Sequence, residues 1–456
     1  MRISFLFALW MGKLSSFAVN LIDKKRGTNF SGKIATKLMC NFISGFRKIN
    51  LDKVIMITGT NGKSTTTNLI AHTIKKSGKK VATNAEGANM MGGVATTLIK
   101  NSTLTGRFKK EFLVLEIDER SLPAIHKLLP AHNLCITNLQ KDQVQRNGDP
   151  DFIYSKFENV INKNMTLFVN NEEPRSRALE DKAGQVVYFS VEKNKKSFEK
   201  NDFYDVTMPC PKCNHKIQYN YFNLESIGNF QCTHCNYKSQ DNPQVLIKNV
   251  EFERKTFECE GEKYNITYNT PFYIYNYAVA IAVAKKFDLT QTQIQQAFET
   301  FINPGERREI LKYKNKNIYY LRMKQENPET LQSALDTIAA DESEKAIFAG
   351  FYEVKDFLPY YSNTFYFFDC NFRDIAKTPV EKYIVFSKTV CYDVANRMIY
   401  DGANKDKIEI IDAEDDIDAI LKKMDEIKTD NIYILTGMKP YKKIKKFIER
   451  EALING

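Results

Sequence analysis

One segment of the chain has residue types that suit phosphate chemistry. It reads Gly59-Thr60-Asn61-Gly62-Lys63-Ser64-Thr65 and directly follows the apolar run Val54–Ile57. Glycines let backbone N–H groups approach a polyphosphate, a lysine neutralises its charge, and a hydroxyl group can bind Mg²⁺. We therefore expect Lys63 to be the cation and Ser64 a magnesium ligand. The alternative is a tight strand-to-helix turn with an incidental lysine.

Four cysteines form a second chemical pattern. Cys210 and Cys213 make one Cys-x-x-Cys pair, Cys232 and Cys235 make another, and 18 residues separate the pairs. Two such turns face to face give four thiolates in a tetrahedron, which is the geometry of a structural Zn²⁺ site without an open position for water. A redox pair is the alternative, although one motif would suffice for that. His215 and His234 lie nearby as competing ligands or as polar surface residues.

Short apolar runs alternate with helical patterns on both sides of these motifs. We expect helical sequence up to residue 48, a helix from Ser64 to Lys79, and a helix over Tyr275–Lys286. The other expected elements are strands at Lys80–Ala82, Phe112–Ile117, Asn133–Thr137, Ile318–Leu321, Ala346–Ala349, Thr364–Phe368, Tyr383–Phe386 and Ile432–Leu435, with helices at Pro328–Ala340 and around Glu414–Ile427. Strand, loop and helix in this order predict an α/β fold with parallel sheets.

Composition limits the class of protein. The chain has 456 residues, of which 43% are hydrophobic and 27% charged, so it is globular. Its longest apolar stretch, Ile3–Met11, is shorter than the about 20 residues of a spanning helix, and we expect a packed N-terminal helix rather than a signal peptide or transmembrane segment. Nine cysteines, an odd number, favour a cytosolic protein. The net charge of +11 fits nucleotides, anionic lipids or nucleic acid as partners, or simple solubility.

Several further segments accompany the phosphate loop. They are Leu115-Glu116-Ile117-Asp118-Glu119, Ile136–Leu139 with Asp142-Gln143, Tyr275-Asn276-Tyr277-Ala278, and Gly305-Glu306-Arg307-Arg308-Glu309. Together with the loop they resemble the Mur ligase family, whose members use ATP to activate a carboxylate as an acyl phosphate before an amine attacks. The resemblance implies an ATP site at Gly59, Thr60, Asn61, Gly62, Lys63, Ser64 and Thr65. It also implies that Glu116 binds Mg²⁺, that Asn276 meets the adenine and that Arg307 lies near the phosphates.

The cysteine ribbon and the additional C-terminal α/β sequence narrow the resemblance. Within the Mur ligase family, the chain is similar to the synthetase subunits of lipid II isoglutaminyl synthases. This similarity implies an N-terminal helical segment at 1–48, a central Mur-ligase-like ATPase domain at 49–309 with a zinc ribbon insertion at about 203–240, and a Rossmann-like C-terminal α/β domain at 310–456. The implied cofactors are ATP, Mg²⁺ and Zn²⁺.

The reaction implied by this resemblance is amidation of the D-glutamate α-carboxyl of lipid II to D-isoglutamine, with Lys63 and Glu116 as catalytic residues. Ammonia would come from a GatD-like glutaminase in a heterodimer, because Cys40, Cys135, Cys259, Cys370 and Cys391 all lack the flanking glycines of a nucleophile elbow. In the family an aspartate of the synthetase subunit orients the glutaminase site. Asp356 is the first candidate here, before Glu353 and Asp369, and a solvated loop acid is the other interpretation. The expected location is the bacterial cytoplasm, where lipid II lies at the inner membrane surface and peripheral attachment is compatible.

Two other functions stay open at the level of sequence. One is an independent Mur-like or folylpolyglutamate-like ligase that adds an amino acid. Such enzymes carry a carbamylated lysine, and Lys156 lies near the position where it would be sought, although we interpret it as a helix-surface lysine. The other is a zinc-ribbon nucleic-acid-binding ATPase. No concentrated basic, aromatic-interleaved stretch lies near the ribbon, so no nucleic acid is expected.

Overall fold

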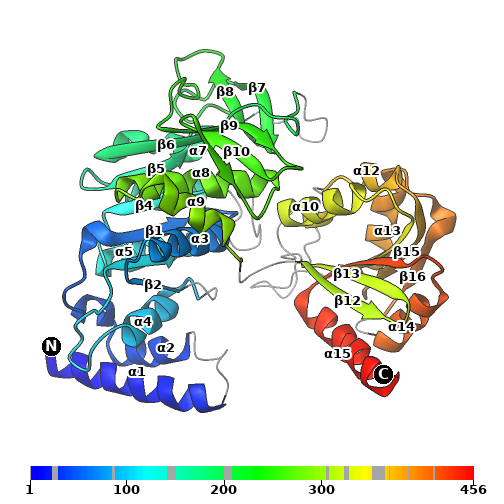
Figure 1. Cartoon of the computed structure of the whole chain (residues 1–456), viewed down its shortest axis with the longest axis horizontal. Helices are drawn as coiled ribbons and strands as arrows, with labels where there is room; N and C mark the ends of the chain where they lie inside the picture. The colour runs from blue at the N-terminus through cyan, green and yellow to red at the C-terminus, as the bar shows by residue number, and fades with distance from the viewer. Residues whose placement is uncertain are drawn as a thin grey trace. The chain divides into compact units, whose positions relative to one another are not determined.

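The computed structural model describes residues 2–22, 29–84, 88–140, 150–199, 208–224, 226–303, 308–322, 328–351, 365–368, 370–388, 390–413 and 416–455. The chain forms two compact units, one made of Met1–Gln140 and Asp149–Gly305 and one made of Lys141–Gly148 and Glu306–Gly456. Figure 1 labels the elements of each unit.

The first unit is built on a nine-stranded sheet with the order β11-β10-β9-β6-β5-β4-β1-β3-β2. Its strands are β1 (Val54–Thr58), β2 (Val81–Thr83), β3 (Phe112–Glu116), β4 (Asn133–Ile136), β5 (Thr166–Asn170), β6 (Gln185–Val191), β9 (Val245–Glu251), β10 (Thr256–Cys259) and β11 (Glu262–Asn265). Within this sheet, every neighbouring pair between β2 at one edge and β9 is parallel. The pairs β9–β10 and β10–β11 are antiparallel.

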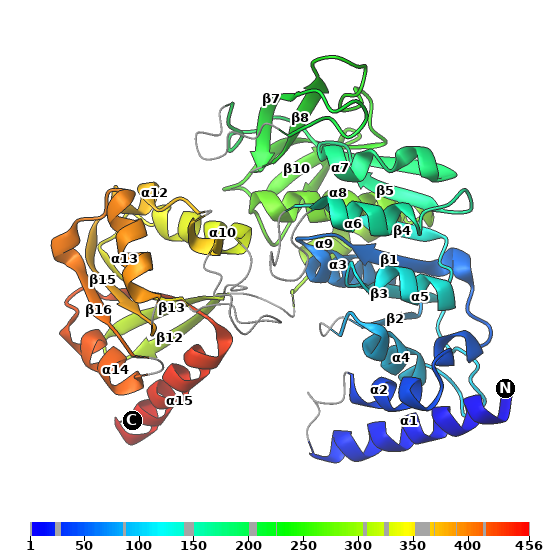
Figure 2. The same cartoon turned by 180° about the vertical axis from the view of Figure 1, so that it is seen from behind.

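Helices cover both faces of this sheet, as Figures 1 and 2 show from opposite sides. One face packs on α3 (Lys63–Lys76), α8 (Pro271–Lys286) and α9 (Gln291–Glu299). The other packs on α1 (Arg2–Ile22), α2 (Phe30–Leu38), α4 (Met91–Lys100), α5 (Leu122–Leu128) and α6 (Pro150–Glu158). Shorter helical turns lie at α7 (Pro174–Arg177), Phe42–Gly45, Leu51–Lys53 and Glu180–Lys182.

Strand β1 explains where a ligand would bind. Its five residues are all buried, as expected for a central parallel strand that is covered on both faces. Its two neighbours, β3 and β4, follow it in the chain on opposite sides, so the strand order reverses at β1. The carboxyl edge of an open α/β sheet at such a switch point is the usual ligand site. The loop that begins at Gly59 lies at this edge.

A two-stranded hairpin is inserted between β6 and β9. It consists of β7 (Ile217–Leu224) and β8 (Ile227–Cys232), and its own small core contains Ile217, Phe230 and Tyr237. Tyr237 joins it to α7, which follows β5, because its hydroxyl donates to the Pro174 carbonyl at 2.5 Å. An isolated hairpin is only marginally stable. We therefore expect a further interaction to stabilise this hairpin.

The second unit has a separate six-stranded sheet with the order β12-β13-β17-β14-β15-β16. Its elements are β12 (Arg308–Tyr313), β13 (Lys316–Arg322), α10 (Pro328–Ala339), β14 (Lys345–Gly350), α11 (Phe365–Phe368), α12 (Arg373–Ala376), β15 (Val380–Phe386), α13 (Cys391–Tyr400), Lys405–Lys407, β16 (Ile408–Ile411), α14 (Ile417–Glu426), β17 (Asn431–Thr436) and α15 (Met438–Asn455). All pairs except β12–β13 are parallel. The α/β fold class is confirmed.

The expected strand at Thr364–Phe368 is wrong. Phe365–Phe368 forms a helical turn, and buried Phe367 packs near Phe351 with ring centroids 6.0 Å apart. A short aromatic run has no periodicity that separates a strand from a buried helical turn, so its neighbours decide the conformation. Among all described helices, none is both long and apolar enough to cross a membrane.

Candidate functional site

The phosphate loop leaves β1 through two glycines in the left-handed region. Gly59 has φ +121° and Gly62, which precedes α3, has φ +81°. A Cβ atom on Gly62 would lie 2.7 Å from Asn276 Oδ1, so both the backbone conformation and the space require glycine. Lys63 then begins α3, whose first-turn N–H groups face the loop and suit an anion.

Residues after β4 hold this loop in place. The Asn138 side-chain oxygen accepts from the Asn61 N–H at 2.9 Å, and the Thr137 hydroxyl donates to the Asn61 carbonyl at 2.6 Å. The Thr60 hydroxyl donates to the Gln140 carbonyl at 3.0 Å. The segment Ile136–Leu139, which resembles the Mur ligase family, therefore helps to fix the conformation of the loop in the absence of a ligand.

Lys63 is buried and paired. Its ammonium group lies 2.5 Å from Glu119 Oε1 and also donates to the carbonyls of Gly59 and Thr60. Burial raises the pKa of Glu119, and the positive charge of Lys63 opposes that shift. A lysine held among carbonyls and one carboxylate beside a glycine loop is ready to exchange these partners for phosphate oxygens.

Glu116 ends β3 next to the phosphate loop, because it pairs in register with Ile57. Its Oε1 accepts from Asn89 Nδ2 at 2.9 Å, and its backbone N–H donates to Asn84 Oδ1 at 2.8 Å. Its Oε2 is buried and has no hydrogen-bond partner among the described residues. A buried carboxylate oxygen without a donor is costly unless a cation binds it. The geometry thus fits Mg²⁺.

A small pocket lies beside the loop. Asn61, Gly62, Asn138, Asn170 and Asn276 form its polar lining, and Phe189, Leu224, Ile227, Phe272, Tyr275 and Val279 are among its other lining residues. Asn276 also accepts from the Thr66 hydroxyl at 3.0 Å, which joins α8 to α3. Asn170 is fully buried, and its Nδ2 has no acceptor among the described residues. Apolar walls with a few convergent amides suit a planar heterocyclic base.

A buried acid lies under this pocket. Glu172 Oε2 accepts from the Tyr275 hydroxyl at 2.6 Å and from the Val191 N–H at 3.1 Å. Burial raises the pKa of Glu172 to about 7, although these hydrogen bonds oppose the shift. Asn223 of the hairpin donates to the Tyr275 hydroxyl at 3.1 Å, so the hairpin, the sheet and α8 meet in one polar network.

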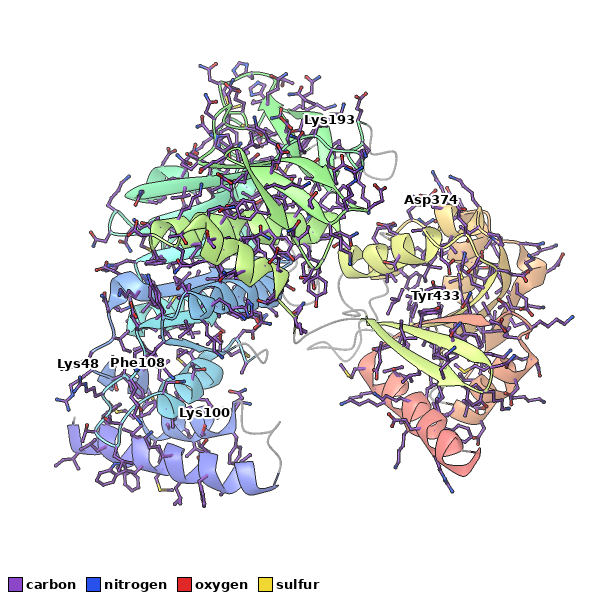
Figure 3. The ribbon with its side chains drawn as sticks, in the orientation of Figure 1. Lys48, Lys100, Phe108, Lys193, Asp374 and Tyr433 are labelled. Carbon is purple, nitrogen blue, oxygen red and sulfur yellow. The ribbon has the colours of Figure 1, made fainter. Side chains whose placement is uncertain are left out.

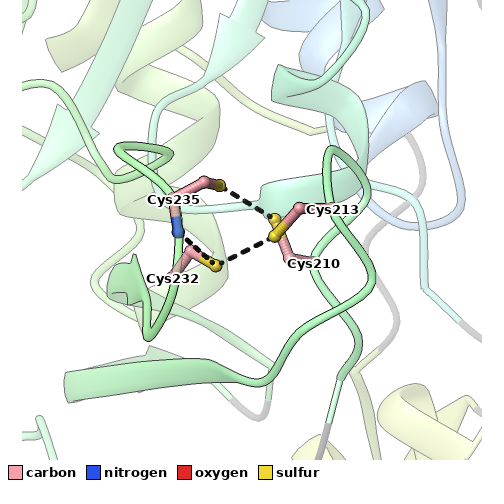
Figure 4. A group of neighbouring side chains, drawn as sticks. All are labelled: Cys210, Cys213, Cys232 and Cys235. Carbon is pink, nitrogen blue, oxygen red and sulfur yellow. Dashed lines mark hydrogen bonds between the residues drawn. The ribbon is translucent and has the colours of Figure 1, made fainter.

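The four cysteines converge as expected (Figure 4). All four Sγ atoms lie within 4.8 Å of one another, with Cys210 and Cys235 at 3.8 Å and Cys213 and Cys232 at 3.5 Å. A tetrahedral Zn²⁺ with bonds of about 2.3 Å separates its sulfurs by about 3.8 Å. The backbone N–H groups of His234 and Cys235 donate to Cys232 Sγ at 3.4 Å each. Burial disfavours this thiolate, yet these donors lower the pKa of Cys232 to about 6. The set fits a structural metal centre.

Comparison with known families classifies the chain. The model of the Mur ligase middle domain matches residues 57–233, and the model of the MurT ligase C-terminal domain matches residues 325–438. The chain belongs to the Mur ligases, in their MurT family. It is therefore an ATP-dependent ligase, and its family implies ATP and Mg²⁺ as cofactors.

Curated MurT relatives match much of the chain. The MurT subunit of the glutamine-hydrolysing lipid II isoglutaminyl synthase of Staphylococcus aureus is 28% identical over 83% of this chain and 84% of its own length. The corresponding subunit of Streptococcus pneumoniae is 30% identical over 66% of both chains. The word subunit in these names implies that those proteins have a partner.

Solved structures show the same fold. A pseudomurein peptide ligase type C from Methanothermus fervidus matches with a TM-score of 0.66 and 20% identity, covering 95% of this chain and 85% of its own. MurF from Acinetobacter baumannii matches with a TM-score of 0.60 and 12% identity, covering 92% of this chain and 80% of its own. At these identities the likeness concerns the fold alone.

Some expected site residues lie outside the described residues of this MurT-family ligase. They are Arg307, Asp142, Gln143, Glu353, Asp356 and Asp369. Lys156 lies on α6, half-buried, with its ammonium group 4.8 Å from the centre of the Phe152 ring. That contact agrees with a helix-surface lysine.

Sequence reasoning did not assign Glu119, Asn170 or Glu172 to the site. Glu172 follows the apolar strand β5 as Glu119 follows β3, so acids after buried strands were the available signal. Its partner Tyr275 lies 103 residues further along the chain, which no local pattern connects.

Proposed function

We propose that this chain is the synthetase subunit of a lipid II isoglutaminyl synthase. It would convert the α-carboxyl of D-glutamate in the lipid II stem peptide into an amide at the expense of ATP. The names of the MurT relatives and the presence of both a Mur ligase middle domain and a MurT C-terminal domain support this proposal. The observation that carries the chemistry is the buried Oε2 of Glu116 beside the phosphate loop, which has no hydrogen-bond partner within the described part of the chain.

The reaction would have two steps. A carboxylate oxygen attacks the γ-phosphorus of ATP, the bond to the bridging oxygen breaks, and ADP leaves an acyl phosphate. Ammonia then attacks the acyl carbon, inorganic phosphate departs, and the nitrogen loses a proton. A free carboxylate is a poor electrophile, and phosphorylation gives it a leaving group. The protein would contribute mainly positioning of the reactants and neutralisation of their charge.

The described residues divide this work. Lys63 would leave Glu119 to neutralise the transferring phosphate, and the N-terminus of α3 would hold the neighbouring phosphates. Glu116 and the exposed Ser64 hydroxyl would hold the divalent cation, with Asn89 orienting Glu116. When bound, Mg²⁺ would neutralise negative charge on the phosphates.

We assign the pocket beside the loop to the adenine base. Asn276 lies between the loop and the pocket, and Asn170 Nδ2, which has no acceptor among the described residues, suits an acceptor nitrogen of the ring. An Asn170→Leu variant keeps the volume but loses the donor, so it should raise KM for ATP by about tenfold. Arg307 near the phosphates remains a prediction.

Ammonia would come from a separate GatD-like glutaminase, with Asp356 as the predicted orienting acid. The cysteines outside the ribbon support an external source of ammonia. Cys135 and Cys259 are buried in strands, and burial raises the pKa of Cys259 to about 11. A buried thiol of raised pKa is a poor nucleophile.

Reconstitution tests the proposal. The purified chain, given ATP, Mg²⁺, lipid II and ammonium chloride, should form amidated lipid II, detected by mass spectrometry. Glutamine should replace ammonium only when the glutaminase subunit is added. A product that contains an added amino acid would instead favour an independent ligase.

A further inference from the structure

Helix α1 has two apolar faces. One faces the protein, where Phe5, Ala8, Leu9 and Gly12 are buried. Phe5 stacks on Phe42 with ring centroids 5.3 Å apart, and a Cβ atom on Gly12 would lie 2.7 Å from the Ile99 side chain of α4. This face explains how α1 packs against α2, α4 and the turn at Phe42–Gly45.

The opposite face is apolar but exposed. It carries Ile3, Phe7, Trp10, Leu14 and Phe17, whose exposed fractions are 85, 55, 53, 62 and 65%. Their spacing of three and four residues places them on one side of the helix. We call these five residues the outer apolar face. A helix on the surface of a water-soluble domain normally carries polar residues there.

The outer apolar face extends onto neighbouring elements. The Trp10 indole donates to the Leu104 carbonyl at 2.9 Å, which holds Leu104, 66% exposed, beside the helix. Phe30 and Leu38 at the two ends of α2 are about half exposed. Leu104 therefore extends the outer apolar face beyond α1, and α2, which packs on α1, carries further exposed apolar residues.

The described segments that build this part of the unit carry basic charge only. No acidic residue occurs among positions 2–22, 29–51 and 88–110. The basic residues of these segments whose side chains are exposed are Lys33, Lys37, Arg47, Lys48, Lys100, Arg107 and Lys109. Figure 3 shows Lys48 and Lys100 in the part of the unit that holds α1, α2 and α4. Scattered surface charge would mix signs, because the whole chain has 66 basic and 55 acidic residues.

We propose that the outer apolar face docks on an anionic phospholipid bilayer, with α1 lying in the plane of the interface. Amphipathic helices of this kind insert Trp, Phe and Leu to the level of the headgroups while basic residues attract anionic lipid. Within the described residues, α1 is not apolar enough along its length to cross a membrane. This proposal rests on the proposed function in one respect: docking on the bilayer would bring the chain to its lipid-linked substrate.

The first experiment measures binding without substrate. The full chain is mixed with vesicles of phosphatidylglycerol and phosphatidylcholine that contain neither lipid II nor nucleotide. Trp10 is the sole tryptophan, so its fluorescence should shift to shorter wavelength as it enters the interface. Pure phosphatidylcholine vesicles and higher salt should both weaken binding.

Variants locate the contact. Leu14→Glu and Phe17→Glu should each lower the vesicle partition coefficient by about tenfold or more, because a charge replaces an exposed apolar side chain that the bilayer would bury. Lys33→Glu should lower it several-fold on anionic vesicles only. Tyr400→Glu is the matched control, since Tyr400 is 79% exposed on α13 in the second unit, and it should bind as the parent does. Equal thermal midpoints and ATP turnover would show that the variants fold.

Three outcomes would overturn the inference. The parent chain fails to bind anionic vesicles, or Leu14→Glu binds as well as the parent. Alternatively, Leu14→Glu converts a dimer to a monomer or releases the glutaminase subunit without changing vesicle binding, which would assign the face to a protein partner.

A substrate comparison separates this inference from the proposed function. Leu14→Glu should amidate a water-soluble stem peptide at the parent rate but act more slowly on lipid II in vesicles. If the proposed function fails instead, the parent amidates neither substrate while it still binds vesicles.

Discussion

Loss of the ribbon metal should weaken nucleotide binding, because the hairpin that carries the cysteines also lines the nucleotide pocket. The pairing Ile217↔Cys232 closes the metal end of the hairpin, and Leu224↔Ile227 closes the pocket end. Both Leu224 and Ile227 line the pocket. Cys210→Ser or Cys232→Ser would remove one ligand, and a two-stranded hairpin without its clamp is marginal.

The expected magnitude follows from the pocket wall. Leu224 and Ile227 are 7% and 1% exposed, so the protein already buries them and they give the base an apolar wall to pack against. Displacement of this wall would return about 60–120 Å² of apolar contact surface to water, which costs about 1.5–3 kcal/mol at about 25 cal/mol per Å². This corresponds to an increase in Kd for ATP of about 10- to 100-fold.

The assay combines metal content with nucleotide titration. Zinc is quantified by mass spectrometry, and Kd is measured with a fluorescent ATP analogue. Cys40→Ser is the control, because Cys40 is exposed and lies outside the ribbon. A ribbon variant that has lost its metal but binds the nucleotide as tightly as the parent would refute this coupling.

Three other perturbations follow from the structure. Glu116→Gln should lower ATP turnover by at least about 100-fold, whereas Asn89→Ala, which only frees Glu116, should raise the Mg²⁺ concentration for half-maximal turnover by about tenfold; equal effects of both would contradict their separate roles. Because the folded pKa of Glu172 is raised from 4.5 to about 7, its contribution to stability is complete below pH 4.5 and is lost as the pH rises to about 7, at a cost of up to about 3 kcal/mol. Urea unfolding should therefore show that Glu172→Gln gains stability relative to the parent over that range, and a constant difference would exclude this role. The isolated chain should release no ammonia from glutamine, because Cys135, Cys259, Cys370 and Cys391 are buried and the exposed Cys40 lacks the flanking glycines of a nucleophile elbow; release measured by a coupled assay would place a glutaminase site within the chain.

Local patterns predicted the parts of the site that lie close together in the chain. The loop at 59–65 and the cysteine pairs have short spacings whose chemistry is specific, and both converge in the structure. The apolar run before Glu116 also predicted its strand correctly. These signals are local because a single turn of the backbone places most of the groups of each motif.

Long-range contacts could not be predicted in this way. Lys63 and Glu119 are 56 residues apart, and Tyr275 reaches Glu172 across 103 residues. The pairing depends on strand order, which places β3 and β5 at the same edge of the sheet as the loop. The contact between the hairpin and the pocket could not be predicted for the same reason. The cysteines predicted a metal site at one end of the hairpin but did not indicate what its other end contacts.

The most direct test of the proposed reaction follows oxygen from the substrate. Lipid II labelled with ¹⁸O in the D-glutamate α-carboxyl is incubated with the chain, ATP, Mg²⁺ and ammonium, and the released phosphate is analysed by mass spectrometry. An acyl phosphate requires that one labelled oxygen moves to inorganic phosphate for each amide formed. Unlabelled phosphate, or phosphate release without amidated lipid II, would contradict the account.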